Sequence, residues 1–127
     1  MTNGAIGCLL VALFVLAGPN AARADGTPAA GQRVYAKCGA CHPVAADGRH
    51  GVGPNLRGVV GRRAGSVPGF GFSAALRRSP LYWTEPNLRI SIRRPKDLVA
   101  GCGGPGTLGV RNPQEIEDVL AYLKSLK

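Results

Sequence analysis

Two cysteines and a histidine stand at a spacing that suits one covalent chemistry. The chain reads Cys38-Gly39-Ala40-Cys41-His42, so two residues separate the thiols and the histidine follows directly. At this spacing each thiol can add to one vinyl group of a haem, while the imidazole of the next residue reaches the iron. We therefore expect one covalent haem c on Cys38 and Cys41, with His42 as the proximal iron ligand.

Three other chemistries use paired cysteines and stay open at this point. A zinc site would need two more ligands at comparable spacing, and only Cys102 and His50 are left after residue 24. A thioredoxin-like redox pair would follow a strand in a βαβ unit, and no such context is readable here. A disulfide between Cys38 and Cys41 would close a very short loop, which strains the bond. We favour the haem interpretation over these three.

Residues 1–24 have the pattern of an export signal. Residues 6–17 form an apolar run, and Ala22-Arg23-Ala24 follows with the small residues typical of a signal-peptide cleavage site. The run is too short to span a bilayer, which takes about 20 apolar residues. We expect cleavage after Ala24, export to the periplasm and no membrane span in the mature protein. An uncleaved segment would instead serve as a membrane anchor.

The charge of the chain is strongly positive. Lys and Arg number 16 against 7 Asp and Glu, a formal net charge of +9, and the loss of Arg23 with the signal leaves +8. Such a balance favours acidic partners. The export signal and the lack of a helix-turn-helix or zinc-finger pattern exclude nucleic acid. Acidic protein surfaces or anionic lipid headgroups are the expected partners.

The elements that must position the motif are helices within one domain, residues 25–127. Val34 and Tyr35 give an apolar side to a helix that ends in the cysteine motif. Thr84 is the expected N-cap of a helix after which the chain turns away at Arg94-Pro95.

Asn112, with Pro113 at the first helical position, marks the start of the last helix. This helix carries an apolar stripe of Ile116, Val119, Leu120 and Leu123. The predicted helices cover residues 29–40, 73–78, 84–94 and the segment after residue 112. With 19 Gly and 10 Pro in 127 residues, the rest must be loops, and an apolar cofactor would supply part of the interior.

Several further segments extend the pattern beyond the cysteine motif. The segments that carry the likeness are Gly31–His42, Gly51–Leu56, Gly61–Gly69, Trp83 and Ala121–Lys124. Taken together they resemble class I cytochrome c of the mitochondrial and alphaproteobacterial type. The likeness runs over nearly the whole mature chain, with its segments in the order of the family.

The resemblance implies an all-α cytochrome c fold, with three to five helices and long loops around one covalent haem. In that fold the first and last helices cross. Gly31 would allow their close approach, and Tyr35 would pack near Val119 and Tyr122.

The resemblance also implies roles for residues around the haem. The Pro54 carbonyl would accept the outer ring N–H of His42 and so fix its tautomer. Arg62 and Trp83 would serve a buried haem propionate. His50 is expected to be a structural hydrogen-bonding residue rather than a ligand.

One family feature is missing from the sequence. Members of the family bind the iron on its other side through a methionine on a glycine-rich loop, but Met1 is the only methionine here. Gly104 or Pro105 stands at that position. Three outcomes are open: Cys102 binds as a thiolate, the position is empty or holds water, or a lysine such as Lys96 binds. Cys102 could also be a small buried residue or a site of dimerisation.

Other positions near the haem differ from the family as well. Phe70 and Phe72 replace two expected tyrosines, Leu76 replaces an asparagine, and Ser91 replaces a tyrosine. Phe70, Phe72 and Leu76 each remove a polar group that would touch the haem or its axial side, and Ser91 removes the tyrosine hydroxyl expected there. We expect a rebuilt distal pocket.

The expected function is electron transfer by an exported mono-haem carrier rather than an enzyme. Arg33, Lys37 and Lys96 are candidates for a basic haem edge that docks acidic reductase or oxidase surfaces. The alternative is a haem enzyme or a protein that binds NO, CO or peroxide at an open or Cys102-ligated site. A degraded paralogue that holds haem and does little is a third possibility.

Overall fold

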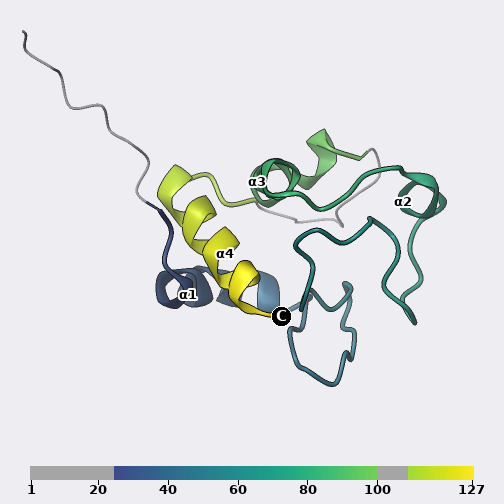
Figure 1. The fold of residues 1–127 in the computed structure, drawn as a ribbon, viewed down its shortest axis with the longest axis horizontal. Helices are drawn as coiled ribbons and strands as arrows, with labels where there is room; N and C mark the ends of the chain where they lie inside the picture. Colours follow the sequence, from purple (N-terminus) through teal and green to yellow (C-terminus); the bar gives the residue numbers. More distant parts are fainter. Residues whose placement is uncertain (1–24, 100–108) are drawn as a thin grey trace, which may run out of the picture.

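The computed structural model describes residues 25–99 and 109–127. In these ranges the chain forms four α-helices and one 3₁₀ turn, and no strand; the only β pairing is an isolated bridge between Arg63 and Tyr82. The elements are α1 (Pro28–Gly39), α2 (Ala74–Arg78), α3 (Glu85–Arg93), η1 (Pro95–Asp97) and α4 (Pro113–Ser125). The all-α prediction is confirmed (Figure 1).

Polar residues fix where the helices begin. The side chain of Thr84 accepts a hydrogen bond from the Asn87 amide, and Asn112 accepts from the Gln114 and Glu115 amides. These bonds satisfy amides that have no partner within the first turn of a helix. Both caps were predicted. The 3₁₀ turn η1 was not predicted, and it occupies the place where the chain was expected only to turn away from α3.

The first and last helices cross at very close range, as predicted. A Cβ atom built on Gly31 would lie 1.9 Å from the Asp118 carbonyl oxygen and 2.7 Å from the Tyr122 Cβ atom. Only glycine lets the two backbones approach this closely. Beside the crossing, the rings of Tyr35 and Tyr122 pack with their centroids 5.3 Å apart.

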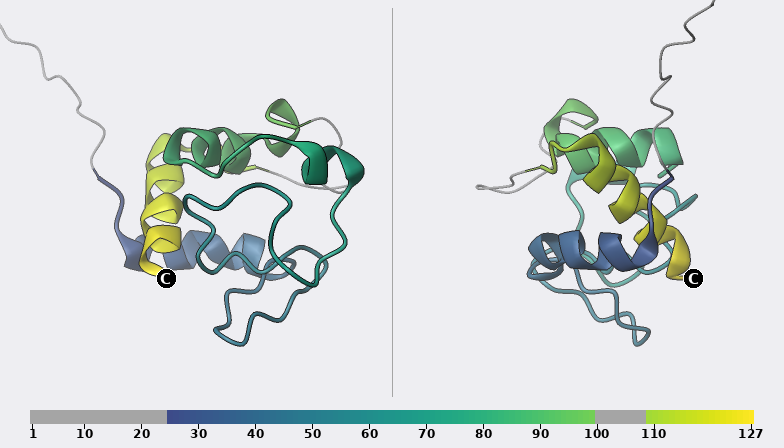
Figure 2. Two further views of the ribbon diagram at one scale, coloured as in Figure 1. Left: turned by 45° about the vertical axis from the view of Figure 1, so that its right-hand side comes forward. Right: turned by 90° about the vertical axis from the view of Figure 1, so that its left-hand side faces the viewer.

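The buried core lies where α4 meets α1 and α3. Figure 2 shows α1 and α3 along opposite sides of the molecule, with α4 joining them at one end and loop segments between them. The predicted apolar stripe of α4 supplies half of the core. The cluster of buried residues is Tyr35, Val59, Leu88, Val119, Leu120 and Leu123.

Ion pairs tie α3 to α4 at the surface. Arg89 binds the Glu117 carboxylate through two nitrogens, with Nε 2.9 Å from Oε1 and Nη2 3.0 Å from Oε2. The Glu85 carboxylate forms ion pairs with Lys124 and Arg89, with Oε1 2.6 Å from Lys124 Nζ and Oε2 3.5 Å from Arg89 Nη2. No helix among the described residues has the length and apolar character needed to cross a membrane.

Side chains hold the long loop together in place of regular structure. Asn55 is buried, and its Nδ2 donates to the carbonyls of Ala45 and Arg49 at 3.0 Å each. His50 accepts the Asn55 amide on Nδ1 at 2.9 Å and donates Nε2–H to the Pro68 carbonyl at 2.8 Å. Both nitrogens of His50 are therefore used within the loop, which confirms its predicted structural role.

Candidate haem-binding site

The cysteine motif forms the tight turn that ends α1. The amides of Cys41 and His42 both donate to the Cys38 carbonyl, at 3.0 Å and 2.9 Å. Cys38 is half-buried and packs against the core, while Cys41 is exposed, and both thiols are free. Burial raises the pKa of the Cys38 thiol, so it stays protonated at neutral pH. The turn thus places two reduced sulfurs and the imidazole within five consecutive residues.

The imidazole of His42 is fixed in one tautomer. Its Nδ1 lies 2.9 Å from the Pro54 carbonyl oxygen. Because a carbonyl only accepts, Nδ1 must carry the proton, which leaves the Nε2 lone pair for another partner. The hydrogen bond expected from the resemblance is therefore present.

Gly53 lies directly against the same ring. A Cβ atom built on Gly53 would lie 2.4 Å from His42 Cε1 and 2.8 Å from Nε2. The Gly53 amide donates to the Cys41 carbonyl at 2.9 Å, which ties this loop to the motif. A side chain at residue 53 would therefore push the imidazole aside.

The backbone carbonyl of His42 has a partner that the sequence analysis did not foresee. Tyr35 Oη donates to it at 2.7 Å. Burial raises the pKa of the Tyr35 hydroxyl above its usual range, so the group keeps its proton and is a donor at neutral pH. The sequence placed Tyr35 only at the helix crossing. The one available signal was a tyrosine, rather than a purely apolar residue, one turn before Cys38.

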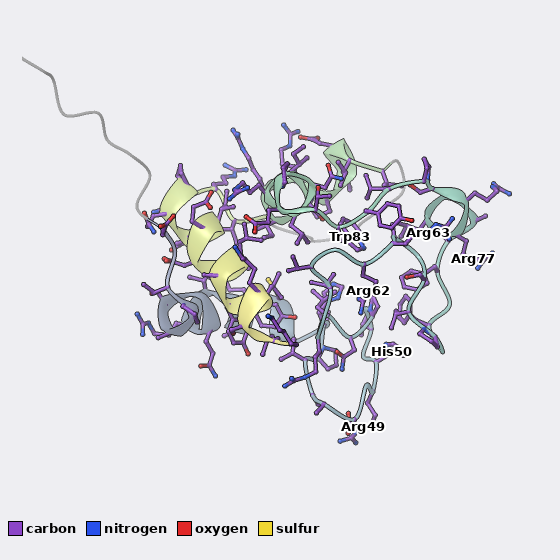
Figure 3. The ribbon with its side chains drawn as sticks, viewed as in Figure 1. Arg49, His50, Arg62, Arg63, Arg77 and Trp83 are labelled. Atoms are coloured by element: carbon purple, nitrogen blue, oxygen red, sulfur yellow. The ribbon has the colours of Figure 1, made fainter. Side chains whose placement is uncertain are left out.

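Arg62 and Trp83 come from two segments whose backbones are paired. The Trp83 amide donates to the Arg62 carbonyl, and the Gly61 amide donates to the Trp83 carbonyl, both at 2.8 Å. In Figure 3 both side chains lie toward the middle of the view, with Arg63 and Arg77 farther out toward α2.

The two side chains lack a partner of the kind that each requires. Arg62 donates only to the carbonyls of Arg57 and Asn55, each at 3.1 Å, and burial lowers the pKa of its guanidinium. Within residues 25–99 and 109–127 no carboxylate pairs with it, and no group accepts from the Trp83 indole. A partly buried cation of this kind favours an anionic partner.

This set of groups fits haem c. Two free thiols and an imidazole with an available Nε2 match the vinyl groups and the iron, and a partly buried arginine that has no carboxylate partner among the described residues matches a propionate. The other chemistries receive no support. The described residues hold no cluster of three His, Cys, Asp or Glu side chains suited to a metal ion, and the motif follows a helix rather than a strand.

Part of the predicted distal side lies outside the described residues. Cys102, Gly104 and Pro105 all fall in the segment 100–108. Lys96 is described, and it is an exposed residue of η1. Phe70 stacks edge-on against Phe72 with ring centroids 4.9 Å apart.

Comparison with known proteins agrees with this geometry. The family model described as cytochrome c matches residues 28–127. The chain is 42% identical over 106 residues to cytochrome c2 of Rhodomicrobium vannielii, covering 80% of this chain and 81% of the relative. It is 38% identical over 120 residues to cytochrome c2 of Blastochloris viridis, covering 91% of each.

Solved structures have the same fold. Cytochrome cH from Methylobacterium extorquens superposes with a TM-score of 0.71 at 40% identity, over 79% of this chain and 99% of that one. Cytochrome c2 from Rhodospirillum centenum gives a TM-score of 0.71 at 34% identity, over 80% of this chain and 98% of that one. The chain therefore belongs to the cytochrome c family, as a cytochrome c2-like electron carrier with one covalent haem c.

Proposed function

We propose that Cys38 and Cys41 attach the haem and that His42 binds its iron through Nε2. The supporting observation is the 2.9 Å bond from His42 Nδ1 to the Pro54 carbonyl, which leaves Nε2 as the available ligand atom. Each thiol S–H would add across one vinyl C=C bond of the haem, with sulfur bonded to one carbon and the hydrogen to the other, so that no oxidant would be needed.

The surrounding residues tune and enclose this site. Bound haem supplies a one-electron Fe(III)/Fe(II) couple. The Pro54 carbonyl keeps the His42 ring oriented and electron-rich by accepting a hydrogen bond from Nδ1–H. Arg62 and Trp83 would donate to a propionate. The role is supported by the partly buried guanidinium of Arg62, which pairs with no carboxylate in residues 25–99 and 109–127.

We also propose that no methionine binds the iron from the other side. Residues 25–127 contain none. The sixth position of the iron is then bound by Cys102 or by a lysine such as Lys96, or it is left without a protein ligand. An open position would allow NO, CO or peroxide to bind, and the missing methionine is the observation that supports this second candidate function.

The proposed partners are acidic-surfaced redox proteins in the periplasm. The sequence carries a net charge of +9, and both Arg33 and Lys37 are exposed on α1, the helix that leads into the cysteine motif. Exposed cations of this kind speed encounter with an acidic surface, and salt screens their effect.

We propose that residues 1–24 are a cleaved signal. The packing of Gly26 against the Glu117 backbone supports a domain that begins near residue 25.

Spectra of protein made in cells with a working haem-attachment system test the ligand set. Replacement of His42 by Ala should change the Soret and EPR spectra of the purified haem protein, because the iron loses its proximal imidazole, whereas His50→Asn, the matched control, should keep the wild-type spectra. Rapid CO binding would support an open sixth position. Loss of a low-spin ferric signal in Cys102→Ser alone would support thiolate ligation. An ordinary histidine and methionine spectrum would contradict the proposal about the sixth position.

A further inference from the structure

We propose that Tyr35 is a positioning residue for the proximal ligand. Its hydroxyl holds the His42 carbonyl and so fixes the backbone from which the imidazole extends. The inference rests on the proposed role of His42 as an iron ligand. It goes beyond the helix-crossing role of Tyr35, because packing alone needs only the ring.

The geometry of Tyr35 suits this task. Its side chain is 5% exposed, and Oη lies 2.7 Å from the His42 carbonyl oxygen, seven residues further along the chain. The ring is held on one side by Tyr122, at 5.3 Å between centroids. Gly39 also lies beside the ring, because a Cβ atom built on it would be 3.7 Å from Tyr35 Cε1. Burial and the contact with Tyr122 therefore confine the ring that carries the hydroxyl.

The carbonyls of the motif show why a donor is needed there. A helix end leaves its last carbonyls without partners inside the helix. The Cys38 carbonyl accepts from the Cys41 and His42 amides, and the Cys41 carbonyl accepts from the Gly53 amide. The next residue, Pro43, has no amide proton that could contribute to the turn. The Tyr35 hydroxyl gives the carbonyl of His42 a hydrogen-bond donor.

His42 is thus held at two independent points. Pro54 holds the ring through Nδ1, and Tyr35 holds the backbone through the carbonyl oxygen. If the backbone hold is removed, the peptide unit between His42 and Pro43 gains freedom. The Nδ1–Pro54 bond then weakens, and the imidazole donates less electron density to the iron.

Two matched variants of the haem-loaded protein separate positioning from packing. Tyr35→Phe removes only the hydroxyl that reaches His42. Tyr122→Phe removes a hydroxyl from the ring packed against it, and that hydroxyl has no hydrogen bond to a described residue. In Tyr35→Phe we expect hydrogen exchange of the His42 Nδ1 proton to accelerate about two- to tenfold, as for a lost hydrogen bond. The reduction potential should also rise, because a weaker imidazole donor stabilises Fe(III) less.

The outcomes distinguish this inference from the proposed function. Faster exchange and a raised potential in Tyr35→Phe, with both unchanged in Tyr122→Phe, would support it. Equal behaviour of the two variants would overturn it. Wild-type protein without covalently bound haem would instead refute the proposed function. If Tyr35→Phe does not fold, the wild-type Tyr35 hydroxyl proton decides by NMR: slow exchange supports the hydrogen bond, and no protected hydroxyl signal overturns it.

Discussion

The helical half of the molecule and its loop half are held together by different means. Helices α1, α3 and α4 supply five of the six residues of the buried core cluster, and α1 meets α4 with no space for a Cβ atom on Gly31. The loop of residues 43–73 contributes only Val59 to that cluster. It depends on side chains that bond backbone carbonyls, because irregular segments leave their own polar groups unpaired.

His42 stands where the two halves meet. Its backbone belongs to the turn that ends α1, while its ring contacts Gly53 and Pro54 of the loop. The comparison implies a graded response to mutation. Changes in close helix packing should lower the free energy of unfolding most. Changes at the junction should alter the haem ligand, and changes in the loop or at the helix surface should lower the free energy of unfolding least.

The largest effect is expected from Gly31→Ala. The new methyl group would meet the Asp118 carbonyl at 1.9 Å, and neither backbone can move without separating α1 from α4. We expect a loss of more than about 3 kcal/mol in the free energy of unfolding, measured by urea titration. Gly71→Ala is the control, because a Cβ atom there meets nothing within 4 Å. Equal stability of the two variants would contradict the close crossing.

Gly53→Ala tests the junction. Its methyl group would occupy space within 2.4 Å of His42 Cε1, so the ring must shift and weaken its bond to Pro54. We expect an altered haem absorption spectrum and a loss of about 1–3 kcal/mol in the free energy of unfolding. Gly71→Ala again serves as the control. A wild-type spectrum in Gly53→Ala would show that the ring is not confined by the loop.

Arg63→Gln probes the loop half. Its Nη2 donates to the carbonyls of Arg77 and Ser79, at 3.2 Å and 3.3 Å, near the surface. Loss of these bonds should lower the free energy of unfolding by about 0.5–1 kcal/mol in the same urea titration. The exposed Arg78 makes no side-chain hydrogen bond to a described residue, so Arg78→Gln should leave stability unchanged. A larger loss than in Gly53→Ala would reverse the proposed ranking.

The smallest effect concerns an exposed ion pair and depends on pH. The Lys124 ammonium and then the Arg89 guanidinium lower the pKa of Glu85 below its ordinary 4.5. A lowered folded pKa stabilises the protein above pH 4.5, and that contribution is lost as the pH falls through the folded value. Because the Glu85 side chain is 38% exposed, Glu85→Gln should cost only about 0.5 kcal/mol at pH 7. The difference from wild type should shrink in urea titrations as the pH falls below 4.5; a difference that stays constant with pH would contradict the ionic origin.

The sequence was sufficient for the features that depend on local chemistry. Thr84 and Asn112 predicted their helix starts because a capping side chain acts within three residues. The apolar stripe of α4 and the glycine at the helix crossing followed from periodicity and from the family resemblance. The bond from His42 to Pro54 also followed from that resemblance.

Contacts that depend on three-dimensional packing were not readable. The bond from the Tyr35 hydroxyl to the His42 carbonyl depends on how the ring is wedged beside Tyr122, and no spacing rule encodes it. The carbonyls that accept from Arg62 were likewise invisible, because a backbone acceptor leaves no mark on residue identity. Sequence thus identifies the reactive groups better than it identifies what holds them.

Peptide mapping of the purified protein tests the central claim most directly. Trypsin cuts after Lys37 and Arg49, so residues 38–49 form one peptide that contains both thiols of the motif and His42. The account predicts that this peptide carries the full mass of one haem, while the peptide that contains Cys102 carries none. An unmodified 38–49 peptide from protein matured with a working attachment system would contradict it.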